Sequence, residues 1–249
     1  MGNEMSSPAP QIQKFKTVRD PAADAHINGD YYKKNPTWHV EYSPWKAQTI
    51  HDFLNRRGLK PKTIADVGCG AGEVLAQLQK RMPADCRFSG FDVAAPAIAM
   101  AKTRENENLK FQLADLCEIE TPRFDLLMAL EVIDHVEDYI GFARAVKNRA
   151  EWKYFSFSLD ISVQSAIRGG AFTQRRKVHS HLHHFNQQTA LGTLEYAGYE
   201  IVDWFYAPPG VSGSMKAKLA RPIRNALFAL SPDLTVRTLG GYSLQVLAR

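Results

Sequence analysis

Three glycines and one carboxylate lie close together in the first third of the chain. Residues 63–73 read Thr-Ile-Ala-Asp-Val-Gly-Cys-Gly-Ala-Gly-Glu. Glycine has no Cβ and tolerates positive φ, so a turn of this composition lets a ligand lie against bare backbone. The apolar run before the turn and the amphipathic stretch after it predict a strand, a tight turn and a helix N-terminus. We therefore expect the turn to bind a nucleoside-like cofactor through Asp66, Gly68, Cys69, Gly70 and Gly72.

Further carboxylates recur at the ends of predicted strands, at Asp92, Asp115 and Glu131. Because parallel strands end at one edge of a sheet, we expect these acids to share a rim with Asp66. A dinucleotide site has the spacing G-x-G-x-x-G and binds pyrophosphate there, whereas this turn reads G-x-G-x-G behind an acid. Asp66 would repel a pyrophosphate and support a cationic ligand, directly or by fixing the loop. Asp92 suits a ribose diol, so the pattern favours a cationic adenosine cofactor.

Histidines offer a second kind of chemistry. Four of them lie within residues 179–184, and His135 follows a predicted strand. Imidazole is the natural general base for an alcohol, so His135, His183 and His184 are our catalytic candidates, with hydrogen-bonded structural histidines as the alternative. We expect no metal, because the histidine run contains no cysteine and no carboxylate.

Aromatic and basic residues on either side of these motifs are candidates for the substrate wall. The aromatic segment 31–42 precedes the first strand and is interpreted as a lid, or else as plain packing on the sheet rim. A basic pair before the histidine run suits a phosphate or carboxylate of the substrate, or else forms a solvated loop. The substrate-binding candidates are Tyr31, Tyr32, Trp38, His39, Arg175 and Arg176.

Strand and helix patterns alternate through the middle of the chain, which predicts a parallel sheet with right-handed crossovers. Strands are expected at 63–67, 87–92, 109–113, 124–130, 153–158, 199–206 and 241–248, the last antiparallel to its predecessor. Helices are expected at 43–59, 72–82, 96–105, 138–150 and 188–197, with Ser43 as the N-cap of the first.

The remaining segments set the domain organisation. We expect a disordered tail at 1–12 and a single domain at 13–249. Within that domain, residues 13–60 form a lid or cap of helices, 161–188 a His-rich substrate loop and 207–238 an insertion. The insertion is basic and amphipathic, though Pro222 should break or start a helix there. Docking on the protein itself or on a second subunit is favoured for it, and an anionic membrane is the alternative.

Four motifs in register resemble the class I S-adenosylmethionine (SAM)-dependent methyltransferases. They are Ala65–Gly72, Gly90–Val93, Ala114–Leu116 and the run from Phe124-Asp125-Leu126-Leu127 into Glu131–Val136. The resemblance covers roughly residues 45–160 and extends towards the C-terminus through 181–185 and 194–201. It implies an α/β, Rossmann-like three-layer sandwich. That fold has a mostly parallel seven-stranded sheet, a C-terminal antiparallel strand and an N-terminal helical cap.

The same resemblance implies roles for individual residues. Gly68 and Gly70 would line the methionine part of SAM, and Asp92 would hold the ribose hydroxyls. The remaining contacts would come from two groups. Val93, Asp115 and Leu116 would surround the adenine, and Leu130 and Glu131 would border the sulfonium and the acceptor. For the strand-end acids, capping of the following turn is the alternative to ligand binding.

Composition narrows the class of protein. The chain has 249 residues, a net charge of +5 and three cysteines without metal spacing, so we expect reduced thiols in the cytoplasm. The mild basic excess does not by itself indicate nucleic-acid binding. The sequence contains no stretch of 18 apolar residues, so we expect no membrane-spanning helix. Motifs for methylating amino groups or cytosine C5 are missing.

We therefore expect a SAM-dependent methyltransferase that yields S-adenosylhomocysteine (SAH), as a monomer or homodimer. A small-molecule acceptor is favoured, methylated on oxygen, with a sugar or glycan precursor foremost. The alternatives are a lipid-linked or quinone-like acceptor at a membrane surface and a non-catalytic SAM-binding protein.

Overall fold

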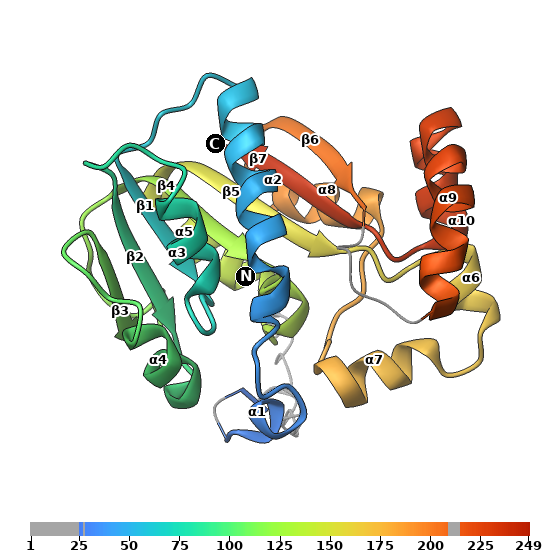
Figure 1. The fold of residues 1–249 in the computed structure, drawn as a ribbon, viewed down its shortest axis with the longest axis horizontal. Coiled ribbons are helices and arrows are strands. Elements are labelled where there is room, and N and C mark those ends of the chain that lie inside the picture. Colours follow the sequence, from blue (N-terminus) through green and yellow to red (C-terminus); the bar gives the residue numbers. More distant parts are fainter. Residues whose placement is uncertain (1–24, 27, 209–214) are drawn as a thin grey trace, which may run out of the picture.

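A seven-stranded sheet forms the centre of the molecule (Figure 1). The computed structural model describes residues 25–26, 28–208 and 215–249, with only the backbone for 215–218; the expected tail at 1–12 lies outside them. The strands run in the order β3-β2-β1-β4-β5-β7-β6. Their bounds are Thr63–Val67 (β1), Arg87–Asp92 (β2), Leu109–Leu113 (β3), Phe124–Leu130 (β4), Ala150–Ser158 (β5), Ile201–Ala207 (β6) and Ser243–Ala248 (β7). β1 to β5 are parallel and β7 is antiparallel to β5 and β6, so the predicted fold class is confirmed.

Helices cover both faces of this sheet and its carboxyl edge (Figure 1). The α-helices are Asp30–Lys34 (α1), Ser43–Arg56 (α2), Glu73–Gln79 (α3), Ala95–Lys102 (α4), Tyr139–Val146 (α5), Val163–Ile167 (α6), Ala171–His179 (α7), Gln187–Tyr196 (α8), Met215–Leu230 (α9) and Pro232–Leu239 (α10). Short 3₁₀ turns occur at Val40–Tyr42 (η1), Ile133–His135 (η2) and Lys147–Arg149 (η3).

The sheet is apolar on both faces, which gives the three predicted layers. Successive side chains of a strand point to opposite faces. Tyr154 of β5 therefore packs against Phe53 of α2, with ring centroids 5.8 Å apart. Its neighbour Phe155 packs on the other face against Tyr199, at 5.2 Å. Burial on both faces explains why the parallel strands read as nearly continuous apolar runs.

Two expectations about the connecting segments are wrong. Residues 161–188 contain α6 and α7 rather than a loop. α6 begins with a capping box in which the Ser162 hydroxyl accepts the Ser165 N–H at 3.1 Å, and α7 follows Gly170 at φ 79. The insertion holds α9, which continues through Pro222 instead of breaking. That residue is exposed, so water can bond the carbonyl group that lacks its usual N–H partner.

A smaller difference concerns where α2 begins. Ser43 is the first residue of α2 rather than its N-cap, because η1 leads directly into the helix from Tyr42. Among the helices in the described ranges, none is long and apolar enough to cross a membrane.

Candidate functional site

A cavity of about 700 Å³ opens at the carboxyl ends of β1 to β5. The loop after β1 forms its floor, and residues that follow β2, β3, β4 and β5 supply further wall. The segment before β1 contributes Tyr31, Trp38 and His39, and α7 contributes Arg175 and His179. This is the edge at which open α/β sheets bind ligands.

The glycine loop is bent by positive φ values and tied to the end of β2. Gly68, Gly70 and Gly72 have φ of 70°, 55° and 75°. The Asp92 carboxylate accepts the Gly70 N–H and the Ala94 N–H, each at 2.8 Å. A Cβ on Gly70 would meet only Trp38, at 3.6 Å, so the cavity reaches the bare backbone there. By contrast, a Cβ on Gly72 would lie 2.4 Å from the Phe111 ring, so this glycine serves packing.

Two acids on the cavity floor differ sharply in their electrostatics. Asp66 is 2% exposed, and its Oδ1 has no hydrogen-bond partner within the described residues. Burial raises the pKa of Asp66 to about 8, against the attraction of Lys46. Burial would also raise the pKa of Glu131, but the Lys46 ammonium lies 2.9 Å from the Glu131 carboxylate and holds that pKa below its usual value. Lys46 thus forms an ion pair with Glu131. Among the described residues, Asp66 has no such ion pair, so a cationic ligand could pair with it.

The adenine candidates lie on the β2 and β3 side of the cavity. Val93 is exposed, Leu116 is fully buried and both line the cavity. The Asp115 carboxylate also lines it, and it accepts the Cys117 N–H at 2.8 Å. Asp115 therefore caps the following turn, the alternative weighed for it, and also lines the cavity.

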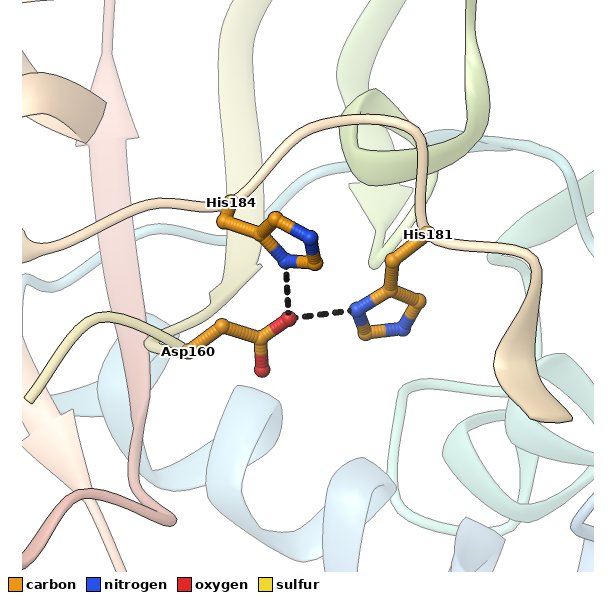
Figure 2. Close-up of side chains that lie close together, drawn as sticks. All are labelled: Asp160, His181 and His184. Carbon is orange, nitrogen blue, oxygen red and sulfur yellow. Dashed lines mark hydrogen bonds and ion pairs between the residues drawn. The ribbon is translucent and has the colours of Figure 1, made fainter. Parts of the chain in front are cut away.

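Elsewhere in the cavity wall, one carboxylate binds three basic side chains, and Figure 2 shows the two histidines among them. Asp160 Oδ2 accepts from Nδ1 of His181 at 2.7 Å and from Nδ1 of His184 at 2.9 Å. Arg175 Nη1 lies 2.8 Å from the other oxygen. We call Asp160, Arg175, His181 and His184 the Asp160 cluster. All but His184 line the cavity.

Charge within the Asp160 cluster sets its protonation. Burial opposes ionisation of Asp160, yet the hydrogen bond from His181 and the Arg175 charge hold its pKa below the usual value. Burial likewise works against the charged form of His181, but the Asp160 hydrogen bond and the nearby Asp134 raise the pKa of His181 above normal. His181 is therefore the most basic of the cavity histidines whose pKa is displaced.

The other predicted histidines have different surroundings. His135 lines the cavity and donates from Nδ1 to the Ser180 carbonyl at 3.1 Å. Burial, together with His26 and His181, lowers the pKa of His135 well below its usual value. His183 instead donates from Nε2 to the Val136 carbonyl at 3.0 Å, and is not among the cavity residues.

The structure brings most of the predicted site residues together. The cavity includes Asp66, Gly68, Cys69, Gly70, Asp92, Val93, Asp115, Leu116, Leu130, Glu131, His135, Tyr31, Trp38, His39 and Arg175. It does not include Gly72, Tyr32, Arg176, His183 or His184.

Sequence reasoning missed Lys46, Asp160, His26 and His181 as cavity residues. A signal existed for Asp160, which follows the end of β5 as the other acids follow their strands. Asp160 supplies, from outside the histidine run, the carboxylate whose absence from that run was the reason to expect no metal. One candidate ligand atom from each of Asp160, His181 and His184 lies within 4.8 Å of the other two.

Comparison with known proteins shows that part of the chain is similar in sequence to methyltransferases. Residues 64–149 match the family model described as a methyltransferase domain. An uncharacterized methyltransferase of Mycobacterium bovis is 32% identical over 100 residues, which are 38% of this chain and 49% of that protein. A ubiquinone biosynthesis O-methyltransferase of Azorhizobium caulinodans is 37% identical over 103 residues, 38% of each chain. The chain thus spans about half the length, or less, of these curated relatives.

Similarity in structure extends further than similarity in sequence. The plantazolicin methyltransferase BpumL, solved with a desmethylPZN analog and SAH, superposes with a TM-score of 0.62 at 16% identity. That match covers 91% of this chain and 92% of the other. Residues 64–149 are therefore similar in sequence to methyltransferase domains. The chain as a whole has the fold of the class I SAM-dependent methyltransferases, as the sequence motifs predicted.

Proposed function

We propose that this chain is an enzyme that transfers a methyl group from SAM to a hydroxyl group of a small-molecule acceptor. One observation carries the proposal. A single cavity joins the glycine loop, whose backbone is open to a ligand, to a histidine whose Nδ1 is held by a buried carboxylate. The first part suits a nucleoside cofactor and the second suits removal of a proton.

The residues on the cavity floor fit SAM. Asp66 Oδ1 has no partner among the described residues, and a cationic ligand would supply one. The open backbone at Gly70 leaves room for the methionine part, and the exposed Val93 offers an apolar surface to the adenine. A volume of about 700 Å³ lies within the range of small-molecule sites.

His181 is placed to act as the general base. SAM, when bound, supplies the methyl group, its S–CH₃ bond breaking as the O–CH₃ bond forms and neutral SAH remaining. Because Nδ1 of His181 donates to Asp160, Nε2 carries the lone pair, and in Figure 2 that nitrogen points away from the carboxylate. Nε2 takes the acceptor's hydroxyl proton, and Asp160 orients the ring and stabilises the imidazolium.

His135 has the same tautomer, since its Nδ1 donates to a carbonyl group. Its lowered pKa makes it the weaker base, so we assign it to the acceptor wall. Tyr31 and Trp38, with ring centroids 5.1 Å apart, supply aromatic faces beside it. Such faces together with imidazoles suit a sugar or a glycan precursor, the acceptor favoured on sequence grounds.

Transfer of label from methyl-labelled SAM to a metabolite extract and to a panel of hydroxylated acceptors tests the proposal. His181→Ala should lower kcat by about 10²-fold or more while SAM affinity, measured by calorimetry, stays unchanged. Asp160→Asn should lower kcat less and shift the acidic limb of the pH profile to lower pH, because the Asp160 carboxylate raises the pKa of His181. His183→Ala, outside the cavity, is the matched control. Tight SAM binding without label transfer to any pool would instead support a non-catalytic SAM-binding protein.

A further inference from the structure

The α9 helix carries apolar side chains on its solvent side as well as on the side that faces the protein. Phe228 and Arg224 face the protein: the Phe228 ring stacks on Tyr242 at 5.0 Å, and Arg224 donates to the Gly240 carbonyl at 2.6 Å. The opposite side of the helix is apolar and open to solvent. Leu219, Ile223 and Leu230 are exposed to 73%, 67% and 84%.

These apolar residues form one stripe. With about 100° of rotation per residue, residues 219, 223, 227 and 230 fall within one side of α9, and Phe228 falls on the other. Leu234 of α10 is exposed beside them, at 60%. We call Leu219, Ile223, Leu227, Leu230 and Leu234 the apolar stripe. Figure 1 shows α9 and α10 at the periphery of the molecule, away from the helices that cover the sheet.

The charge of the α9 sequence indicates what kind of partner would bind the apolar stripe. The sequence of α9 contains Lys216, Lys218, Arg221 and Arg224 and no acidic residue. An exposed apolar stripe on a basic helix has the chemistry that binds anionic lipid surfaces. In a symmetric dimer through the same face, each basic helix would meet its own copy, and like charges oppose that contact.

We propose that α9 docks this protein on an anionic lipid bilayer, with the apolar stripe in the acyl boundary; the basic charge of the helix sequence favours an anionic surface. The helix is also connected to the cavity. Tyr242, on which Phe228 stacks, lines the cavity together with Gly241 and Ser243. The identity of the acceptor follows from this docking and rests on the proposed methyltransferase function. We infer an amphiphilic acceptor, with a hydroxylated polar head on an apolar tail.

Co-sedimentation of the purified full chain with vesicles tests the docking without SAM. Vesicles of phosphatidylcholine mixed with phosphatidylglycerol should carry the protein into the pellet, and pure phosphatidylcholine should not. The double variant Leu219→Ser/Ile223→Ser should reduce binding on the order of tenfold or more, since two large apolar side chains are lost from the bilayer. Both residues are exposed, so the variant should fold; Leu113→Ser, at an exposed apolar residue of β3, is the control.

Two results would overturn the docking proposal. One is failure of the wild-type chain to sediment with anionic vesicles at low salt. The other is a wild-type dimer, found by light scattering, that the double variant dissociates while vesicle binding is unaffected. SAH titration on the same samples separates these outcomes from failure of the methyltransferase proposal, because SAH binding at the glycine loop does not require α9.

Discussion

Compared with a neutral residue at the same position, the ionisable Asp66 should lower the stability of the fold and strengthen SAM binding. Its pKa is raised by burial from 3.8 to about 8. Between these values the folded chain holds a proton that the unfolded chain has released, so stability falls as pH rises through this window. At pH 7 the difference of roughly three pKa units corresponds to an upper bound of about 4 kcal/mol.

Replacing Asp66 with Asn removes this titration. We expect Asp66→Asn to raise the free energy of unfolding at pH 7 by about 2–4 kcal/mol and Tm by about 5–10 °C. The gain should fall to about 0.6 kcal/mol near pH 4, where much of the carboxyl is protonated in the unfolded chain as well. Denaturant unfolding at pH 4, 5.5 and 7 measures it. An equal effect of the substitution at all three values would refute the reasoning.

The same substitution should weaken the donor selectively. SAM carries a sulfonium charge that SAH lacks, so the ionised Asp66 favours SAM. Calorimetry should show SAM affinity rising with pH up to about pH 8, by at most about tenfold per unit, with proton release detected by comparing buffers of different ionisation enthalpy. Asp66→Asn should abolish this pH dependence and reduce SAM affinity more than SAH affinity. Unchanged SAM binding in the variant would contradict a cation site at this residue.

Three further predictions concern the loop, the ribose site and the Asp160 cluster. Gly72→Ala should cost about 3 kcal/mol, because the residue has φ 75° and its Cβ would meet Phe111; Gly192→Ala, in open space on a helix, should be neutral or stabilising in the same melt. Asp92→Asn should cost about 2 kcal/mol, since an amide NH₂ would face one of the two backbone N–H groups. It should also weaken SAM, SAH and adenosine alike, and an effect confined to SAM would refute its ribose role. Chelator treatment should leave methyl transfer unchanged, because the cluster's carboxylate is held by hydrogen bonds and an arginine; loss of activity that a divalent metal restores would show a metal site instead.

Local features of the site could be predicted because their cause is local. Positive φ at Gly68 and Gly70 is a property of the glycine loop itself, and Asp92 follows from the end of a strand recognisable by its own residues. The helices inside 161–188 were missed because α6 has only five residues and α7 is mostly polar and basic, so neither shows a clear apolar periodicity. The capping serines that start α6 were the available signal.

Long-range pairings could not be predicted in the same way. Lys46 reaches Glu131 across 85 positions of sequence, and nothing in either segment specifies the other. Asp160 gathers His181 and His184 only because α6 and α7 turn the chain back over the cavity. Which histidine is the strongest base therefore depends on tertiary contacts, and the sequence offered His135, His183 and His184 as candidates without His181.

A crystal structure of the chain with SAH tests the central claim most directly. We predict adenine against Val93 and Leu116, ribose at Asp92, and the homocysteine part along Gly68 and Gly70 with its sulfur facing the Asp160 cluster. SAH bound elsewhere, or a nicotinamide dinucleotide that occupies this cavity in preference to SAH, would contradict it.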